Sequence, residues 1–136
     1  MSYLFDTNAI IHLMKVRDPL ATRAREVGPP AIAVSSITLA ELWFGAARST
    51  RPQRSRADQD IALAPFRVLD FDSTAADRYA SVRAKLTSRG RPIGDRDLMI
   101  AAIALANRLT LVTSNVREFE RVDGLSVEDW MVASSD

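Results

Sequence analysis

The chain has 136 residues, a length that fits one domain, and 47% of them are apolar, which is enough to fill one sizeable hydrophobic core. The sequence has no cysteine and one histidine, His12, which excludes disulfide bridges, cysteine zinc sites, histidine-rich metal sites and most catalytic triads. The formal net charge is only +1, yet 16 of the 18 basic residues are arginine. Any metal ion bound here would have oxygen ligands, which suits Mg²⁺ or Mn²⁺.

We expect a soluble cytoplasmic protein that forms one domain over residues 1–136. No apolar run approaches the roughly 20 residues of a membrane-spanning helix. The N-terminus lacks the basic and then apolar layout of a signal peptide. The absence of cysteine is compatible with a reducing compartment. No membrane partner is therefore expected.

Strands and helices are predicted to alternate along the first third of the chain. The apolar residues near 2–5 predict a strand, and helical patterns follow at about 7–15 and 19–26. The β-branched and apolar stretch at 31–35 predicts a second strand. A helix is then expected from Thr38.

The segment RSTRPQRSR follows that helix and is predicted to be a hinge. It contains four arginines: Arg48, Arg51, Arg54 and Arg56. One interpretation is a solvated charged loop, and the other is an edge that contacts phosphate groups or a protein partner. Just before the hinge, the large side chains of Trp43 and Phe44 are expected in the core.

The second half of the chain continues the alternation of helices and strands. The predicted elements are a helix at 57–64, a strand at 67–71, a helix from Thr74 to Gly90, a helix at 97–108, a strand at 109–113 and a short strand at 125–127. Alternating strands and helices predict an α/β fold, in which a central, mostly parallel sheet has helices on both faces.

Acidic residues recur where strands end and helices begin. They are Asp6 after the first strand, Glu41 one turn into the helix after the second, Asp95 and Asp97 at the start of a helix, and Glu118, with Asn115, after the strand at 109–113. Ligands of open α/β sheets bind beyond the carboxyl ends of the strands. Carboxylates gathered there would repel one another unless a divalent cation lay between them.

Each of these acids also has a purely structural interpretation. Asp6 and Asp97 suit helix N-caps. Thr38 and Glu41 match the T-x-x-E capping box, in which the glutamate bonds a backbone N–H. Asp95 is adjacent to Arg96 and suits a local ion pair. His12 lies on an apolar helical face, where a partly buried structural role is expected.

The order of the motifs distinguishes between these interpretations. YLFDTNAII, SSITLAELWFGA and RPIGDRDLMIAAIALANRLTLVTSNVREFERVDGLSVEDW follow one another along the chain. Together they resemble the four signatures of PIN-domain ribonucleases of the VapC toxin type, over essentially the whole sequence. The resemblance implies a PIN-like three-layer fold.

The resemblance implies that Asp6 and Asp97 are the principal ligands of Mg²⁺, for which Mn²⁺ can substitute. Glu41 would complete the acidic cluster directly or through water. The sequence departs from the family at the fourth motif, where Asn115 stands in place of an aspartate. An amide oxygen can bind a metal ion but has no charge, and Glu118 is the expected substitute.

The implied reaction is metal-dependent in-line hydrolysis of RNA phosphodiester bonds, with water as the nucleophile. Thr7, Asn8 and Thr38 are expected to hydrogen-bond the carboxylates. The resemblance also implies partners: structured RNA such as tRNA as substrate, a VapB-type antitoxin as inhibitor, and a second copy in a homodimer or a larger complex. DNA would be bound only through the antitoxin.

Two other classes of protein share part of this pattern. Phosphatases of the haloacid dehalogenase type also have an aspartate at the end of strand one, but they need a second aspartate two residues later, where this chain has Asn8. A PIN-like interaction module with little catalytic activity is the stronger alternative, because Asn115 weakens the cluster and a fold does not establish an activity.

Overall fold

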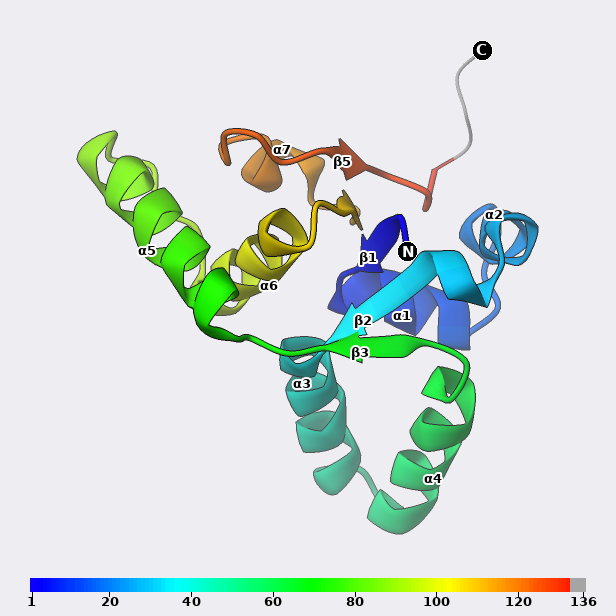
Figure 1. Cartoon of the computed structure of the whole chain (residues 1–136). Coiled ribbons are helices and arrows are strands. Elements are labelled where there is room, and N and C mark those ends of the chain that lie inside the picture. The colour runs from blue at the N-terminus through cyan, green and yellow to red at the C-terminus, as the bar shows by residue number, and fades with distance from the viewer. Residues whose placement is uncertain (133–136) are drawn as a thin grey trace.

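The structure is a computed structural model, described here for residues 1–132 (Figure 1). Five strands form one sheet in the order β3-β2-β1-β4-β5, and all four neighbouring pairs are parallel. The strands are β1 (Tyr3–Phe5), β2 (Ile32–Ser35), β3 (Arg67–Leu69), β4 (Thr110–Val112) and β5 (Val127–Glu128). The predicted parallel α/β architecture is confirmed.

Helices connect every strand to the next. They are α1 (Thr7–Met14), α2 (Leu20–Val27), the 3-10 helix η1 (Pro29–Ala31), α3 (Ser36–Ala47), α4 (Pro52–Leu63), α5 (Ser73–Ser88), α6 (Asp95–Ala106) and α7 (Val116–Phe119). Within residues 1–132, none of these helices combines the length and the apolar character needed to cross a bilayer.

Two apolar clusters cover the two faces of the sheet, as the alternation of side chains along a strand requires. On one face, Leu4 and Leu111 pack with residues of α5, α6 and α7. On the other face, Phe5 and Val112 pack with residues of α1, α2, α3 and α4. Helix α6 is apolar nearly all round because it lies between the sheet and α5. These layers hold the ends of the strands at fixed positions.

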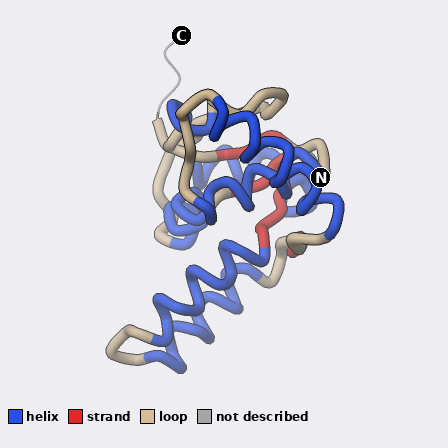
Figure 2. The backbone as a smooth tube through the Cα atoms, turned by 90° about the vertical axis from the view of Figure 1, so that its left-hand side faces the viewer, coloured by secondary structure: helices blue, strands red, loops and turns tan. Residues whose placement is uncertain are grey.

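Helices α3 and α4 form a hairpin that projects away from the sheet (Figures 1 and 2). The predicted hinge at Arg48–Arg56 is wrong in its second half, because α4 already begins at Pro52, five residues before the expected start at 57. Proline suits the first turn of a helix, because backbone N–H groups there have no acceptor within the helix and proline has no N–H. Phe44 lies on this projecting hairpin and is 61% exposed, so its expected core position is also wrong.

Several predicted boundaries are displaced because a neighbouring residue caps the helix. Helix α3 begins at Ser36 rather than Thr38, because the Ser35 side chain accepts a hydrogen bond from the Thr38 N–H. Helix α6 begins at Asp95 rather than Asp97, with Gly94 as its N-cap. The short helix α7 was not predicted, and β5 lies two residues later than expected.

Candidate active site

Asp6 lies at the carboxyl end of the central strand β1, where it caps helix α1. Its Oδ1 atom accepts a hydrogen bond of 2.9 Å from the Ala9 N–H. Its own N–H donates to the Val112 carbonyl of the neighbouring strand at 3.1 Å. The residue is only 5% exposed. The predicted cap is therefore confirmed, but the cap alone leaves a charged carboxylate buried.

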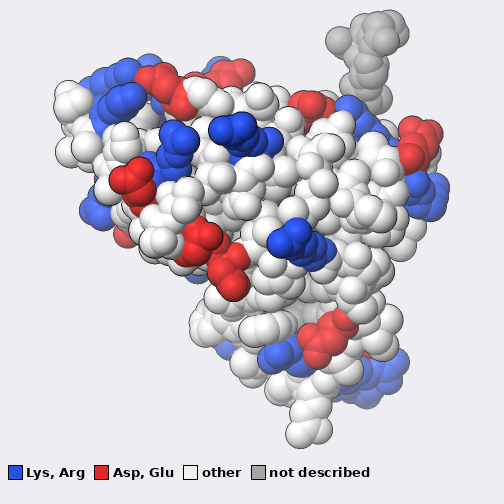
Figure 3. Space-filling view, viewed as in Figure 1, with Lys and Arg blue, Asp and Glu red and all other residues white. Residues whose placement is uncertain are grey.

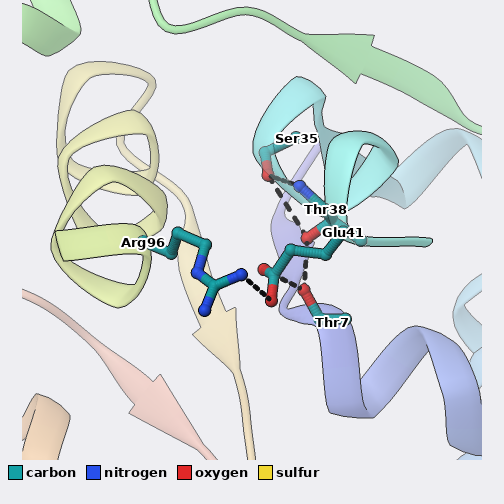
Figure 4. A network of polar contacts seen from close by, with 5 residues as sticks. All are labelled: Thr7, Ser35, Thr38, Glu41 and Arg96. Carbon is teal, nitrogen blue, oxygen red and sulfur yellow. Dashed lines mark hydrogen bonds and ion pairs between the residues drawn. The ribbon is translucent and has the colours of Figure 1, made fainter. Parts of the chain in front are cut away.

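Glu41 meets Thr7 across the gap between α3 and α1 (Figure 4). The Thr7 hydroxyl donates to Glu41 Oε1 at 2.8 Å and lies 3.1 Å from the hydroxyl of the fully buried Thr38. The T-x-x-E capping box is wrong, because Ser35 caps α3 and Glu41 extends toward α1 instead of back toward its own helix. The expected contact of Thr7 with a carboxylate is confirmed. Asn8 is exposed, and no hydrogen bond joins its side chain to a carboxylate within residues 1–132.

Arg96 reaches toward Glu41 from the start of α6 (Figure 4). Its Nη1 atom lies 4.0 Å from Glu41 Oε2, although the side chain is 71% exposed. The predicted local pair of Asp95 with Arg96 is wrong, because Asp95 Oδ1 accepts a hydrogen bond from the Tyr79 hydroxyl at 3.3 Å. The first turn of α6 thus directs Arg96 toward Glu41 and Asp95 toward α5.

Asp97 lies in the first turn of α6 and does not cap it, so the alternative of a purely capping role is wrong for this residue. Burial raises the pKa of the Asp97 carboxyl, and the nearby charges of Glu118 and Glu41 raise it further. Burial likewise raises the pKa of Asp6 to about 6. The Thr113 side chain and the Ala9 N–H lower this pKa, and the charges of Asp97 and Glu41 raise it by smaller amounts. Asp97 is thus close enough to be repelled by each of the other three acids, Asp6, Glu41 and Glu118.

The segment after β4 brings Glu118 to this cluster. Asn115 Nδ2 donates to Glu118 Oε2 at 2.6 Å, and the Gly94 N–H donates to Glu118 Oε1 at 3.4 Å. Asn115 thus holds Glu118 next to the start of α6. Sequence reasoning missed Thr113, which is fully buried, accepts a hydrogen bond from the Asn115 N–H and has a side chain that lowers the pKa of Asp6. Its place directly before Ser114 and Asn115 in the fourth motif was the available signal.

The arrangement supplies only oxygen donors, the chemistry that a hard divalent cation prefers. In the described part of the chain, however, no three acidic or histidine side chains converge closely enough to ligate one ion. Glu41 is drawn toward Thr7 and Arg96, and Glu118 toward Asn115 and Gly94. These contacts reduce the repulsion among the acids. The oxygen donors are of the kind that a divalent metal ion prefers. Glu41 and Glu118, however, already contact other protein groups instead of pointing at one common position.

Comparison with known proteins reveals relatives over nearly the whole chain. The profile of the PIN domain family matches residues 3–125. The chain is 40% identical over 131 residues to the tRNA(fMet)-specific endonuclease VapC of Shigella flexneri, covering 96% of this chain and 98% of that protein. It is 39% identical over 132 residues to the ribonuclease VapC2 of Haemophilus influenzae, covering 96% and 99% of the two chains.

Solved structures show the same similarity. A chain in the crystal structure of DNA-bound VapBC from Salmonella typhimurium superposes with a TM-score of 0.90 at 37% identity, covering 96% of this chain and 98% of that one. A chain of VapBC2 from Rickettsia felis, bound to a DNA fragment from its promoter, gives a TM-score of 0.87 at 34% identity, covering 96% and 99%. With the profile match, these similarities show that this chain belongs to the PIN-domain family and, within it, to the VapC ribonucleases.

Proposed function

We propose that this chain is a Mg²⁺-dependent endoribonuclease that acts as the toxin of a VapBC-type toxin–antitoxin pair. It would hydrolyse phosphodiester bonds in structured RNA such as tRNA, in the cytoplasm. The observation that carries the proposal is the cluster of Asp6, Glu41, Asp97 and Glu118 at the carboxyl ends of parallel strands. The proposed RNA substrate rests on the relatives named as a tRNA endonuclease and a ribonuclease.

In this proposal Asp6 and Asp97 hold Mg²⁺, or Mn²⁺ in its place, and Glu41 contributes directly or through water. PIN-domain nucleases generally depend on a divalent metal ion. When bound, the ion would lower the pKa of a water molecule, orient the scissile phosphate and stabilise charge on the departing oxygen. A nearby cation stabilises the ionised form of a carboxylate, and the effect is largest for a buried carboxylate with a raised pKa, such as that of Asp6.

The protein groups around the acids orient them. The Ala9 N–H orients Asp6, the Thr113 side chain lowers the pKa of Asp6, and the Thr7 hydroxyl orients Glu41. Glu118, beside Asp97, supplies the negative charge that Asn115 lacks. The motifs place no serine, cysteine or histidine nucleophile here, so water is the proposed attacking group, in line with the departing oxygen.

The proposed partners are a VapB-type antitoxin and a second copy of the chain. The similar chains from Salmonella typhimurium and Rickettsia felis were solved as VapBC bound to DNA. The antitoxin would inhibit this chain by covering the acids with a basic group, and it would supply the contacts to DNA. The toxin itself would then contact DNA only indirectly.

The first test is cleavage of total RNA by the purified chain, freed of antitoxin, with Mg²⁺ or Mn²⁺ and with chelator. Asp97→Asn should abolish discrete cleavage, because it removes one of the two principal metal ligands. Asp95→Asn is the matched control: it is two residues away on the same helix, exposed, and bonded only to Tyr79 within residues 1–132. Cleavage that survives in Asp97→Asn, or that is lost equally in Asp95→Asn, would contradict the proposed roles.

A PIN-like interaction module with little activity is the second candidate. It is favoured by the uncharged Asn115 and by the engagement of Glu41 with Arg96. Such a module has no need to bind a metal ion. Folded protein that neither cleaves RNA nor gains thermal stability with Mn²⁺ would support the module over the enzyme.

A further inference from the structure

A cavity of about 390 Å³ lies at the opposite end of the sheet from the acids. Its walls come from α5, from the C-terminal end of α6 and from the segments that precede β4 and β5. Thr110, which lines the cavity, opens β4, whereas Val112, whose carbonyl accepts a hydrogen bond from the Asp6 N–H, ends that strand. A strand of three residues is about 10 Å long, so the cavity and the acidic cluster are separate sites.

Three basic side chains line this cavity: Arg78, Lys85 and Arg108. None of them forms an ion pair with an acidic residue within the described range 1–132. Asp123 also lines the cavity, but its carboxylate is paired with Arg89 at 2.9 Å. Lys and Arg side chains lie over the region where α5, α6 and the segment before β5 meet, with Asp and Glu side chains among them (Figure 3). The cavity therefore carries excess positive charge.

Arg108 occupies a backbone position at which glycine is usual. Its φ angle is 56°, in the left-handed region, and it directly follows Asn107, the C-cap of α6. The Arg108 N–H donates to the Leu105 carbonyl, and the Leu109 N–H donates to the Ala104 carbonyl, as in a Schellman motif. A side chain in this conformation costs about 1 kcal/mol relative to glycine. The closed turn anchors the Cα atom of Arg108 at the rim of the cavity.

The remaining lining suits a phosphate group attached to a larger organic part. The hydroxyl-bearing residues Ser81, Thr110 and Ser126 accompany the three cations, and Val82 and Leu105 supply apolar wall. Hydroxyls and cations together bind phosphate oxygens well. The volume lies in the range of about 300–1,000 Å³ that is typical of small-molecule sites.

We propose that this cavity binds the phosphate of a nucleotide, through Arg78, Lys85 and Arg108, at a second site distinct from the acidic cluster. The nucleotide is either part of an RNA chain whose cleaved bond lies elsewhere or a free mononucleotide. The RNA alternative rests on the proposed ribonuclease function, and the mononucleotide alternative does not.

The binding test uses the full chain in excess EDTA, so that no metal ion can retain phosphate at the acids. Calorimetric titration with AMP should give saturable binding of one molecule per chain, and inorganic phosphate should compete for the site. Arg108→Gly should weaken AMP binding about tenfold, the effect of losing one good charged contact, and Arg78→Gln with Lys85→Gln, which removes two such contacts, should weaken it about a hundredfold. Arg108→Gly suits the left-handed backbone and so keeps the fold.

The matched control is Lys15→Gln with Arg25→Gln, which removes the same charge from exposed positions near α1 and on α2. It should leave AMP binding unchanged. If the control weakened AMP binding equally, the effect would depend on net charge alone, and the proposal would be overturned.

A second arm distinguishes the two sources of the phosphate without relying on cleavage. The affinity of the Asp97→Asn chain for tRNA is measured in EDTA, with and without the Arg78 and Lys85 substitutions. Weaker tRNA binding assigns the cavity to the RNA backbone, whereas unchanged tRNA binding with lost AMP binding assigns it to a free nucleotide. Failure of folded protein to bind AMP or phosphate, together with tRNA affinity equal to the control, would overturn the proposal even if the chain cleaves RNA.

Discussion

Asp6 is a helix cap in the structure and a metal ligand in our proposal, two roles that its position in the sequence left as alternatives. It caps α1 through the Ala9 N–H, as a neutral asparagine or serine also would. An aspartate at that cap is harder to ionise than it would be in water, since burial raises its pKa to about 6. Asparagine or serine would avoid this cost of a buried charge. The cap explains where the residue lies, and the proposed metal site explains why it is an acid.

Asp6→Asn should stabilise the metal-free protein at neutral pH. Because the pKa of Asp6 is raised from 3.8 to about 6 in the folded state, its contribution to stability is fully present below pH 3.8 and is lost as the pH rises through about 6. Asparagine keeps the cap and never ionises. The expected gain in the free energy of unfolding is about 1–3 kcal/mol at pH 7.5 and close to zero near pH 4.

Urea unfolding in EDTA at the two pH values measures this difference. Asp58→Asn, at an exposed position of α4, is the control and should show no such dependence. A metal-free Asp6→Asn protein that is less stable than the original chain at pH 7.5 would contradict the interpretation.

Asn115 stands where the resemblance to the family led us to expect an aspartate, and its amide donates a hydrogen bond to Glu118. Asn115→Asp replaces that donor with a second carboxylate. We expect the metal-free protein to lose about 1–3 kcal/mol of stability, because the Glu118 hydrogen bond is replaced by repulsion. Mn²⁺ should bind more tightly to this variant. Titration of Mn²⁺ into both proteins tests this, and equal affinities would show that residue 115 does not contact the ion.

At the scale of elements, the α3–α4 hairpin separates the arginines of the predicted hinge into two groups. The Arg56 guanidinium lies 3.6 Å from the Trp43 ring centroid and pairs with Asp60 at 3.2 Å. Arg48 lies 5.6 Å from the ring centroid of Phe44. Arg51 and Arg54 form no ion pair or ring contact within residues 1–132. Only these two are free to contact phosphate groups or a partner.

Two matched substitutions on this hairpin should therefore have different effects. Arg56→Ser should lower the free energy of unfolding by about 0.5–1 kcal/mol, through loss of the contact with Trp43. Arg51→Ser with Arg54→Ser should change stability by less than about 0.5 kcal/mol but weaken binding to RNA or antitoxin. Denaturant unfolding and binding titrations on both variants measure this. Unchanged affinities for both ligands in the double variant would exclude a contact role for this edge.

At the scale of the whole molecule, parallel strands bring four acids from distant segments to one end of the sheet. Their mutual repulsion raises the pKa of Asp6 and Asp97, in addition to the effect of burial. A cation bound there would relieve repulsion in the folded state only, because the unfolded chain does not gather these residues.

Mn²⁺ should consequently raise the thermal stability of the chain. At an ion concentration one hundred times the dissociation constant, the expected gain is about 2.7 kcal/mol. Asp97→Asn should lose most of this gain, and Asp95→Asn should keep it. A thermal melt with and without the ion measures the effect. An equal response of the two variants would show that the ion binds elsewhere.

The sequence by itself determined the alternation of strands and helices, the parallel sheet and the acids at its carboxyl end, because these depend on local periodicity and on motif order. It did not determine which of two nearby residues caps a helix, as Ser35 and Thr38 show. It did not identify the carboxylate that Thr7 bonds, which is Glu41, 34 positions away, nor the effect on Asp6 of Thr113, which follows the neighbouring strand β4. The tertiary structure decided these contacts, and the basic cavity at the far end of β4, because they depend on how the packed layers place side chains that are remote in the chain.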